Sequence, residues 1–288
     1  MVESLEIGWN QVEQIVDSAL AEDLGSGDVT TEALVPANQE GKAYLRAKSE
    51  GVLAGMGVAT MVFHRVDSAL RVKELVADGS RVHPGDRLAA IEGKVASILR
   101  AERVALNSLQ RLSGIATQTA RYVEAICGTK ALITDTRKTA PGLRILEKYA
   151  VRVGGGHNHR QNLGDGVLIK DNHLVALRSR GVGLGEAIEK ARQHAPRALK
   201  IEVEVESVEQ AQEALSAGAD IIMLDNMNLE DMRQVVELAR GRAVIEASGR
   251  ITLDSVCAVA NTGVDLISVG ALTHSAKALD ISLDLETK

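Results

Sequence analysis

The residues best suited to chemistry gather between Thr134 and His173, and most of them are cationic. From Arg137 to His173 there are seven lysine and arginine residues against three acidic ones, a balance of +4, whereas the whole chain carries −6. Cationic residues occur in three short motifs of this stretch: TRK, HNHR and IKDNH. Such a concentration of positive charge in an acidic protein favours a site for a small polyanion. The alternative is a solvated basic helix face followed by a loop.

Acidic residues near the ends of two later apolar runs complement these cations. In KIEVEVE (200–206), Glu202 and Glu204 alternate with isoleucine and valine, so the glutamates share one face of a strand. We expect that face to point into a barrel, where buried carboxylates need cations or a metal; the alternative is an exposed edge strand. Asp225 ends the run DIIMLD and, with Glu204, predicts an oxygen site for Mg²⁺ or for ribose hydroxyls. A helix N-cap is the simpler role for Asp225 or for the asparagines after it.

Glycine turns and two histidines add further candidates. Ser248-Gly249 and Gly270 follow apolar runs and each precedes a predicted helix, so their backbone N–H groups are placed to hold a phosphate. His157 and His159 have no third ligand at metal-site spacing. We expect His159 to hydrogen-bond an anionic ligand and His157 to be structural.

The elements that must position these residues alternate between strand and helix. Strands are predicted at 131–134, 166–170, 200–206, 220–225, 243–248 and 265–270, with helices at 142–153, 184–194, 207–217, 229–240 and 252–261. This alternation predicts an α/β fold with a parallel sheet, and polar residues end each strand, as at the active face of an α/β barrel. Because six strands are evident, we expect an incomplete, about six-stranded barrel.

The N-terminal part is predicted to be a smaller α+β domain. We expect it to span 1–115, with the tail at 271–288 packing back on it, and the barrel with the active site to span 116–270. A long helix from Ser97 to about Cys127 is predicted, with Gly114 interrupting it near the domain boundary.

Composition excludes several classes of function. An acidic pI near 5.7 and only five aromatic residues argue against nucleic acid as a partner. No apolar run approaches the length of a membrane span, and the acidic N-terminus predicts a cytoplasmic protein. Cys127 and Cys257 lie in apolar helix-like settings, so we expect buried thiols.

Five segments carry a resemblance to a known family: TRKTAPGLRILEKYAVRVGGGHNHRQNLGDGVLIKDNH, EVEVES, IMLDNM, EASGRI and SVGALTHS. In these segments the chain resembles the quinolinate phosphoribosyltransferases, also called carboxylating nicotinate-nucleotide pyrophosphorylases. The likeness extends to AERVALNSLQRLSGIAT and ALDISL and covers nearly the whole chain. It implies transfer of a phosphoribosyl group from 5-phosphoribosyl-1-pyrophosphate to quinolinate with decarboxylation, giving nicotinate mononucleotide, pyrophosphate and CO₂ in NAD biosynthesis. It also implies a homodimer in which the N-terminal domain of one subunit caps the barrel of the other, with higher oligomers open.

The resemblance assigns roles residue by residue. The expected quinolinate-binding residues are Arg103, Arg137, His159, Arg160 and Lys170, with Arg103 donated to the partner's site. Lys138 would reach the phosphoribosyl donor, Glu204 and Asp225 would hold ribose hydroxyls and Mg²⁺, and the 5′-phosphate would lie on Ser248, Gly249, Arg250 and Gly270. Thr136, Ser268 and Val269 complete the expected substrate-binding set, and the expected catalytic residues are Lys138, Lys170, Glu204 and Asp225.

Two departures and three alternatives stay open. Arg250 stands where many relatives have glycine, and the loop at 177–187 has no assigned role. One alternative is a Schiff-base aldolase with Lys170 as nucleophile. A second is a non-catalytic sugar-phosphate sensor, and a third is a phosphoribosyltransferase for another small aromatic acid.

Overall fold

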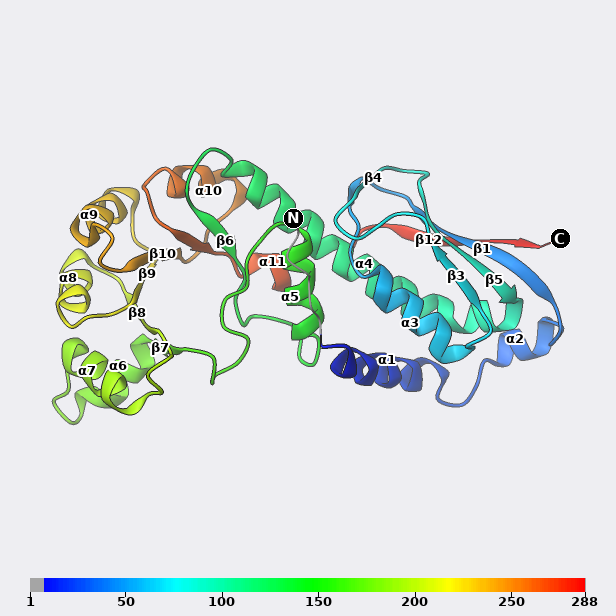
Figure 1. Ribbon diagram of the computed structural model, residues 1–288, viewed down its shortest axis with the longest axis horizontal. Helices are drawn as coiled ribbons and strands as arrows, with labels where there is room; N and C mark the ends of the chain where they lie inside the picture. Colours follow the sequence, from blue (N-terminus) through cyan, green and yellow to red (C-terminus); the bar gives the residue numbers. More distant parts are fainter. Residues whose placement is uncertain (1–7, 288) are drawn as a thin grey trace. The chain divides into compact units, whose positions relative to one another are not determined.

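The computed structural model describes residues 8–287, which form two compact units (Figure 1). Unit 1 contains the described residues up to Ala120, together with Thr139–Gly155 and the stretch from Leu272 onward. Unit 2 contains Arg121–Lys138 and Gly156–Ala271. Residues 139–155 therefore pack with unit 1, although they lie within the 116–270 range drawn from the sequence.

An antiparallel sheet forms the centre of unit 1. Its strand order is β12-β1-β5-β3, from Ile281–Thr287, Glu40–Ala47, Arg87–Lys94 and Arg71–Glu74. A separate short ribbon pairs β2 (Gly51–Val52) with β4 (Arg81–Val82). Fully buried side chains such as Phe63, Leu45, Ile91 and Ile98 make the apolar core. The C-terminal segment is thus an edge strand of this sheet.

Helices complete unit 1, and one of them differs from expectation. They are α1 (Trp9–Leu24), α2 (Val29–Leu34), α3 (Met56–Val66), α5 (Arg144–Val153) and the 31-residue α4 (Val95–Ala125). The prediction that Gly114 interrupts α4 was wrong, because the helix runs through it. A Cβ there would lie 2.1 Å from the carbonyl oxygen of Lys277, so glycine is needed for close packing of the 277–278 backbone.

Unit 2 is a curved, six-stranded parallel sheet with the order β6-β11-β10-β9-β8-β7. The strands are Leu132–Thr134, Leu266–Ser268, Val244–Ser248, Ile221–Asp225, Ile201–Val205 and Val167–Ile169, in that order. Among the described residues β6 and β7 do not pair, so the barrel is open, as the sequence predicted. β8 lies between two neighbours, which rules out the edge-strand alternative for IEVEVE.

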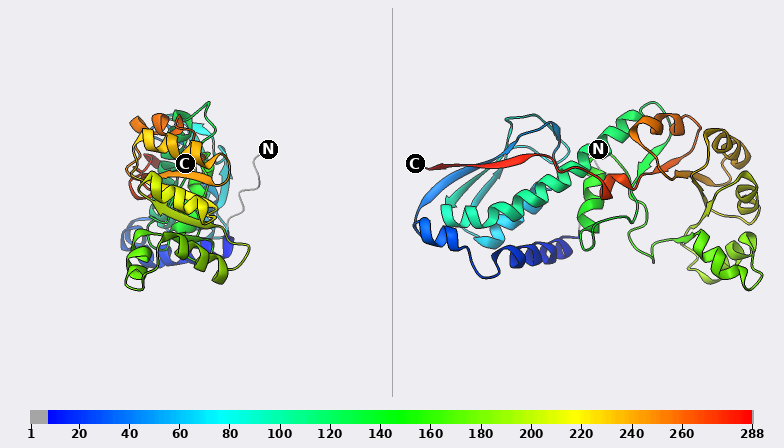
Figure 2. Two further views of the ribbon diagram at one scale, coloured as in Figure 1. Left: turned by 90° about the vertical axis from the view of Figure 1, so that its left-hand side faces the viewer. Right: turned by 180° about the vertical axis from the view of Figure 1, so that it is seen from behind.

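Helices cover the outer face of this sheet (Figures 1 and 2). They are α7 (Leu184–His194), α8 (Val208–Ser216), α9 (Leu229–Ala239) and α10 (Leu253–Ala260), while α11 (Ala271–His274) follows the last strand. Ile201, Val203 and Val205 are at most 1% exposed, consistent with a helix-covered sheet. An additional helix, α6 (Asp171–Arg178), begins within the KDNH motif and reduces the predicted 177–187 loop to the turn before α7.

Two remaining expectations concern the surface. Both cysteines are exposed, so the prediction of buried thiols was wrong: Cys127 lies in the turn after α4, and Cys257 lies on the exposed side of α10. Within residues 8–287, no helix combines the length and the apolar character needed to cross a bilayer.

Candidate functional site

A pocket of about 460 Å³ lies at the carboxyl ends of the strands of unit 2. Every strand of the sheet contributes to it at or just after its carboxyl end. The lining residues are Thr136, Arg137, Lys138, His159, Arg160, Leu168, Lys170, Glu204, Met223, Asp225, Glu246, Ser248 and Ser268. The structure therefore brings together ten of the residues predicted from the sequence, drawn from segments more than 130 residues apart.

The cations of the pocket crowd one another. Burial, followed by the neighbouring guanidinium of Arg137, lowers the pKa of Arg160. Arg160 is oriented by its Nη1, which donates to the carbonyl of Gly166 at 3.0 Å. Guanidinium groups held this close together repel, and an anion bound between them relieves that repulsion. The arrangement suits a ligand with more than one carboxylate or phosphate.

Lys170 and Glu204 form an ion pair at the wall of the pocket. The Nζ of Lys170 lies 2.6 Å from Oε2 of Glu204, whose side chain is 13% exposed. The backbone N–H of Lys170 donates to Nδ1 of His173, an interaction that caps the N-terminus of α6. Asp225, at the end of β9, accepts a hydrogen bond of 2.8 Å from Nδ2 of Asn226. The helix-cap role belongs to Asn228, whose side chain accepts from Glu230 and Asp231 backbone N–H groups.

His159 is held by carboxylates beneath the cations. Its Nε2 lies 3.1 Å from Oε2 of Glu202 and 3.6 Å from Oε2 of Glu246. On the other side of the ring, Nδ1 accepts the backbone N–H of Arg160 at 2.9 Å. Buried Asp135 accepts the backbone N–H of His159 at 2.9 Å. The ring of His159 is therefore held between Glu202 and the backbone of Arg160, and its own backbone is held by Asp135.

Glu246 is the acid of this cluster whose carboxylate is left without a close partner in the described part of the chain. It is fully buried, and neither carboxylate oxygen has a hydrogen-bond partner of ordinary geometry among the described residues. Burial, followed by the charge of Glu202, raises the pKa of Glu246 to about 7, while His159, Ser268 and Lys170 act in the opposite direction. Sequence reasoning missed Glu246 and Asp135; the signal was a lone acid in or directly after an apolar strand.

The turn after β10 has unusual backbone geometry. Gly249 has φ +94°, and a Cβ there would lie 2.4 Å from Oδ1 of Asn226. Asn226 and Arg250 also have positive φ, 54° and 48°. Gly249 therefore admits close packing against Asn226 of the turn after β9, and its turn has the positive-φ backbone found in loops that hold phosphate.

Five predicted site residues are not among the residues that line the pocket. Gly249, Arg250, Val269 and Gly270 lie on the two turns that follow β10 and β11, next to lining residues. Arg103 is exposed on α4 of unit 1.

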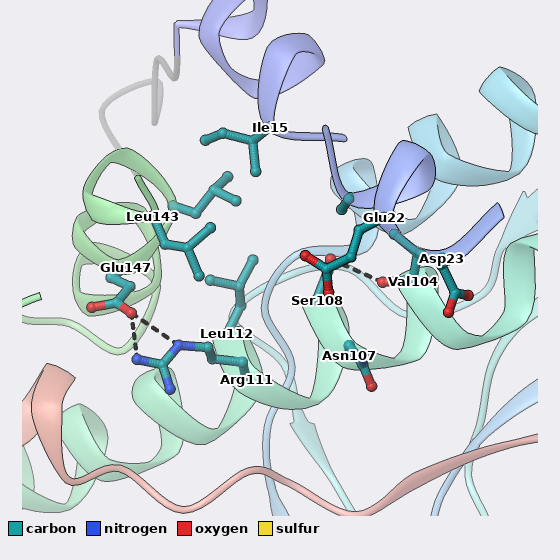
Figure 3. Close-up of a pocket in the computed structure, with 12 residues that line it drawn as sticks. Ile15, Glu22, Asp23, Val104, Asn107, Ser108, Arg111, Leu112, Leu143 and Glu147 are labelled. Carbon is teal, nitrogen blue, oxygen red and sulfur yellow. Dashed lines mark hydrogen bonds and ion pairs between the residues drawn. The ribbon is translucent and has the colours of Figure 1, made fainter. Parts of the chain in front are cut away.

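A second pocket, of about 220 Å³, lies among α1, α4 and α5 of unit 1 (Figure 3). Its wall is largely apolar, with Glu22, Asp23 and the pair formed by Arg111 and Glu147. Since the arginine is already matched by a buried carboxylate, this pocket offers no net positive charge to a polyanion. The pocket of unit 2 is the better candidate for catalysis.

Comparison with known proteins agrees with this geometry. Residues 28–113 match the quinolinate phosphoribosyl transferase N-terminal domain, and residues 115–284 match its C-terminal domain. The chain is 46% identical over 275 residues to a probable nicotinate-nucleotide pyrophosphorylase (carboxylating) of Bacillus subtilis, covering 96% of this chain and 93% of that protein.

Two more relatives extend the comparison. Quinolinate phosphoribosyltransferase (decarboxylating) 2b of Nicotiana tabacum, described as mitochondrial, is 42% identical over 311 residues, with 100% and 87% coverage. The crystal structure of NadC from Streptococcus pyogenes superposes with a TM-score of 0.93 at 45% identity, covering 98% of this chain and 99% of that one. The chain belongs to the quinolinate phosphoribosyltransferase family.

Proposed function

We infer that this chain transfers the phosphoribosyl group of 5-phosphoribosyl-1-pyrophosphate to quinolinate with loss of CO₂. The products are nicotinate mononucleotide and pyrophosphate, so the enzyme is a pentosyltransferase, one of the glycosyltransferases, of NAD biosynthesis. The observation that carries this conclusion is the cation-lined pocket at the strand ends of a chain from this family. Both substrates are polyanions, and four lysine and arginine side chains line the pocket.

We propose that Arg137, Arg160 and Lys170 bind the two carboxylates of quinolinate, with His159 beside them. Guanidinium groups pair with carboxylates through two parallel N–H bonds, and the crowding of Arg137 and Arg160 makes an anion between them favourable. Thr136 supports this edge of the pocket, where its hydroxyl accepts the backbone N–H of Lys138 at 3.0 Å.

The donor would lie on the opposite side of the pocket. We propose that Lys138 contacts its pyrophosphate, and that Glu204 and Asp225 bind the ribose hydroxyls. The 5′-phosphate would be held at the turns after β10 and β11, by Ser248, Gly249, Arg250, Ser268, Val269 and Gly270. The positive φ values of Gly249 and Arg250 in this turn support this assignment.

Magnesium fits the same donor side. Mg²⁺ prefers oxygen ligands and is bound through one or two carboxylates together with substrate phosphates. Glu204 and Asp225 both line the pocket and offer such oxygens, so we propose them as its holders, directly or through water. When bound, the ion would neutralise charge on the leaving pyrophosphate.

The chain's own contribution to the reaction is position and electrostatics. Arg137, Arg160 and Lys170 orient the quinolinate ring so that its nitrogen faces C1 of the ribose. The carboxylates of Glu204 and Asp225 lie where positive charge develops on the sugar as pyrophosphate leaves. Once the N-glycosidic bond has formed, CO₂ leaves, the pyridinium stabilises the electron pair that remains at C2, and a proton from solvent takes the place of the carboxylate, so no protein nucleophile is required.

The ion pair of Lys170 argues against the aldolase alternative. An amine that attacks a carbonyl must be free to reach it, whereas the Nζ of Lys170 is engaged by Oε2 of Glu204 at 2.6 Å. A sensor without catalysis would have no use for carboxylates facing the donor's ribose.

We also propose a homodimer in which Arg103 reaches the partner's pocket, and a cytoplasmic location. The exposure of Arg103 on α4 leaves it available for contact with another subunit. The location is in keeping with substrates that carry several charges and do not cross membranes unaided; cell fractionation would test it.

The direct test is to mix the protein with quinolinate, phosphoribosyl pyrophosphate and Mg²⁺ and to measure nicotinate mononucleotide. Formation of this product, lost when a chelator is added, is the expected result. Absence of the product with a folded protein would refute the proposed reaction. Product formation that is unchanged by the chelator would refute only the role of Mg²⁺.

A further inference from the structure

Glu246 lies fully buried at the base of the pocket, and the proposed reaction gives it no role. Its neighbours come from several elements: His159 from the loop after α5, Glu202 from β8, Lys170 from the end of β7 and the hydroxyl of Ser268 from β11. The Ser268 hydroxyl lies 3.5 Å from the carbonyl oxygen of Ala247, so it is also drawn toward the backbone. The remaining charges of the pocket are Arg137, Lys138, Arg160, Glu204 and Asp225.

The histidine beside Glu246 has a defined tautomer. Because Nδ1 of His159 accepts the backbone N–H of Arg160, the ring proton of the neutral imidazole lies on Nε2. That proton points to Glu202, whose oxygens lie 3.1 and 3.3 Å away, and Glu246 is more distant at 3.6 Å. The single Nε2 proton of His159 is donated to Glu202. Glu246 must therefore either be buried as an unpaired carboxylate or be protonated itself.

A metal ion is the other way to neutralise this cluster. Ligand atoms of His159, Glu202 and Glu246 all lie within 4.8 Å of one another, a spacing that suits a cation. A metal on Nε2, however, would leave the ring without a proton on either nitrogen, since Nδ1 is an acceptor. The geometry therefore favours a proton.

We propose that Glu246 is a positioning residue for quinolinate, which binds when Glu246 is a neutral carboxylic acid. This inference rests on the proposed function. A bare carboxylate at the base of the pocket would repel a dianionic substrate and would draw the cations away from it. As a neutral acid, Glu246 leaves the positive charge of Arg137, Arg160 and Lys170 facing the ligand, and it does not compete with Glu202 for the proton of His159.

The consequence is that quinolinate and a proton bind together. Glu246 is about half ionised near neutral pH, given its raised pKa. At pH 8 most free enzyme must therefore gain a proton when quinolinate binds. Affinity should fall up to about tenfold for each pH unit above 7, with an uptake approaching one proton per ligand at pH 8.

Isothermal titration of quinolinate into the 288-residue chain measures this uptake, in PIPES, HEPES and Tris buffers of equal ionic strength between pH 6 and 9. Glu246→Gln, which has the shape of the neutral acid, should bind with no proton uptake and with an affinity independent of pH. Glu206→Gln is the matched control, because Glu206 is an exposed glutamate just after β8, and it should keep the wild-type proton uptake.

Several results would overturn the inference. The first is binding of quinolinate by wild type at pH 8 without proton uptake. This result needs no variant, so it would overturn the inference even if Glu246→Gln did not fold. The second is a Glu246→Gln protein whose affinity for quinolinate changes with pH as it does in wild type. The third is a Glu246→Gln protein whose affinity for quinolinate is lowered by the same factor at every pH. If wild type made nicotinate mononucleotide in each case, the proposed reaction would stand; if it formed no product, the reaction itself would fail and this inference with it.

Discussion

Arg111 and Glu147 form an ion pair in unit 1 whose carboxylate is fully buried, and replacing Arg111 with methionine tests what the pair contributes. Figure 3 shows the guanidinium on α4 facing the carboxylate on α5. The Nε of Arg111 donates to Oε1 of Glu147 at 2.9 Å, Nη2 donates to the same oxygen, and Nη2 also contacts the carbonyl of Thr273 at 3.3 Å. Methionine preserves much of the apolar stem and removes every one of these bonds.

The expected loss follows from the burial of the two partners. Glu147 is 0% exposed and would keep one hydrogen bond, from the backbone N–H of Ala140 at 3.3 Å. Breaking a buried pair from one side costs about 3–5 kcal/mol, because the remaining charge stays buried. The Arg111 side chain is 36% exposed, so water enters where it was, and we expect the lower value, about 3 kcal/mol. That is a large share of the roughly 5–15 kcal/mol that stabilises a typical protein.

Urea denaturation followed by tryptophan fluorescence measures the change, because the single tryptophan, Trp9, lies on α1 of unit 1. Arg100→Met is the matched control on the same helix: its pair with Glu32 is exposed and should contribute less than about 1 kcal/mol. Arg111→Met combined with Glu147→Leu should recover most of the loss, since no charge is then buried. The reasoning fails if Arg111→Met costs no more than Arg100→Met, or if the double variant is less stable than the single one.

Four further predictions concern the site. Nicotinate, which lacks the 2-carboxylate, should be a far poorer substrate than quinolinate, because one charge-assisted contact is worth about 2–5 kcal/mol; equal turnover of the two acids would contradict the proposed binding of both carboxylates. Arg250→Gly should raise the free energy of unfolding by about 1 kcal/mol, since Arg250 has φ 48° and glycine adopts that conformation without strain; a loss of stability in urea would show that its side chain matters more. Glu246 has a pKa near 7 in the folded chain against 4.5 for the ordinary group, so its contribution to stability is complete below about pH 4.5 and declines as pH rises to 7, by up to about 3 kcal/mol. Urea denaturation at several pH values should show this decline in wild type and not in Glu246→Gln; identical curves would rule it out. Arg103→Ala and Lys138→Ala should each be nearly inactive alone, yet mixed and exchanged subunits should regain roughly a quarter of wild-type activity, because about half the dimers are mixed and each holds one complete site. Heterodimers without regained activity would mean that Arg103 serves its own chain's site or none.

Much of unit 2 could be predicted from the sequence because its signals are local. Apolar runs such as DIIMLD and DLISVG mark strands, and the polar residue that ends each run falls at the active face of any parallel barrel. Lys170, Glu204 and Asp225 were found in this way, and the structure places all three in one pocket. The family resemblance added roles that no spacing could supply.

What the sequence did not predict depends on contacts between distant segments. Glu246 lies in an apolar strand, and only the fold shows that its neighbours are Glu202 and His159. Gly114 was predicted to break the helix because glycine is a weak helix former. In the structure its missing Cβ allows the 277–278 backbone, more than 160 residues later, to pack closely against α4. The exposure of Cys257 likewise depends on which side of α10 meets the sheet.

The pairing of β12 with β1 affects how the chain is assembled during synthesis. These two strands are separated by more than 230 residues, which include all of unit 2. Until the ribosome has made β12, the edge of β1 has no partner, while unit 2 can already form a complete sheet. An unpaired strand edge invites pairing with other chains, and domains fold as units in the order in which they emerge. The nascent chain therefore passes through a stage with a finished barrel and an unfinished sheet, and this is the stage at which a chaperone would be most useful.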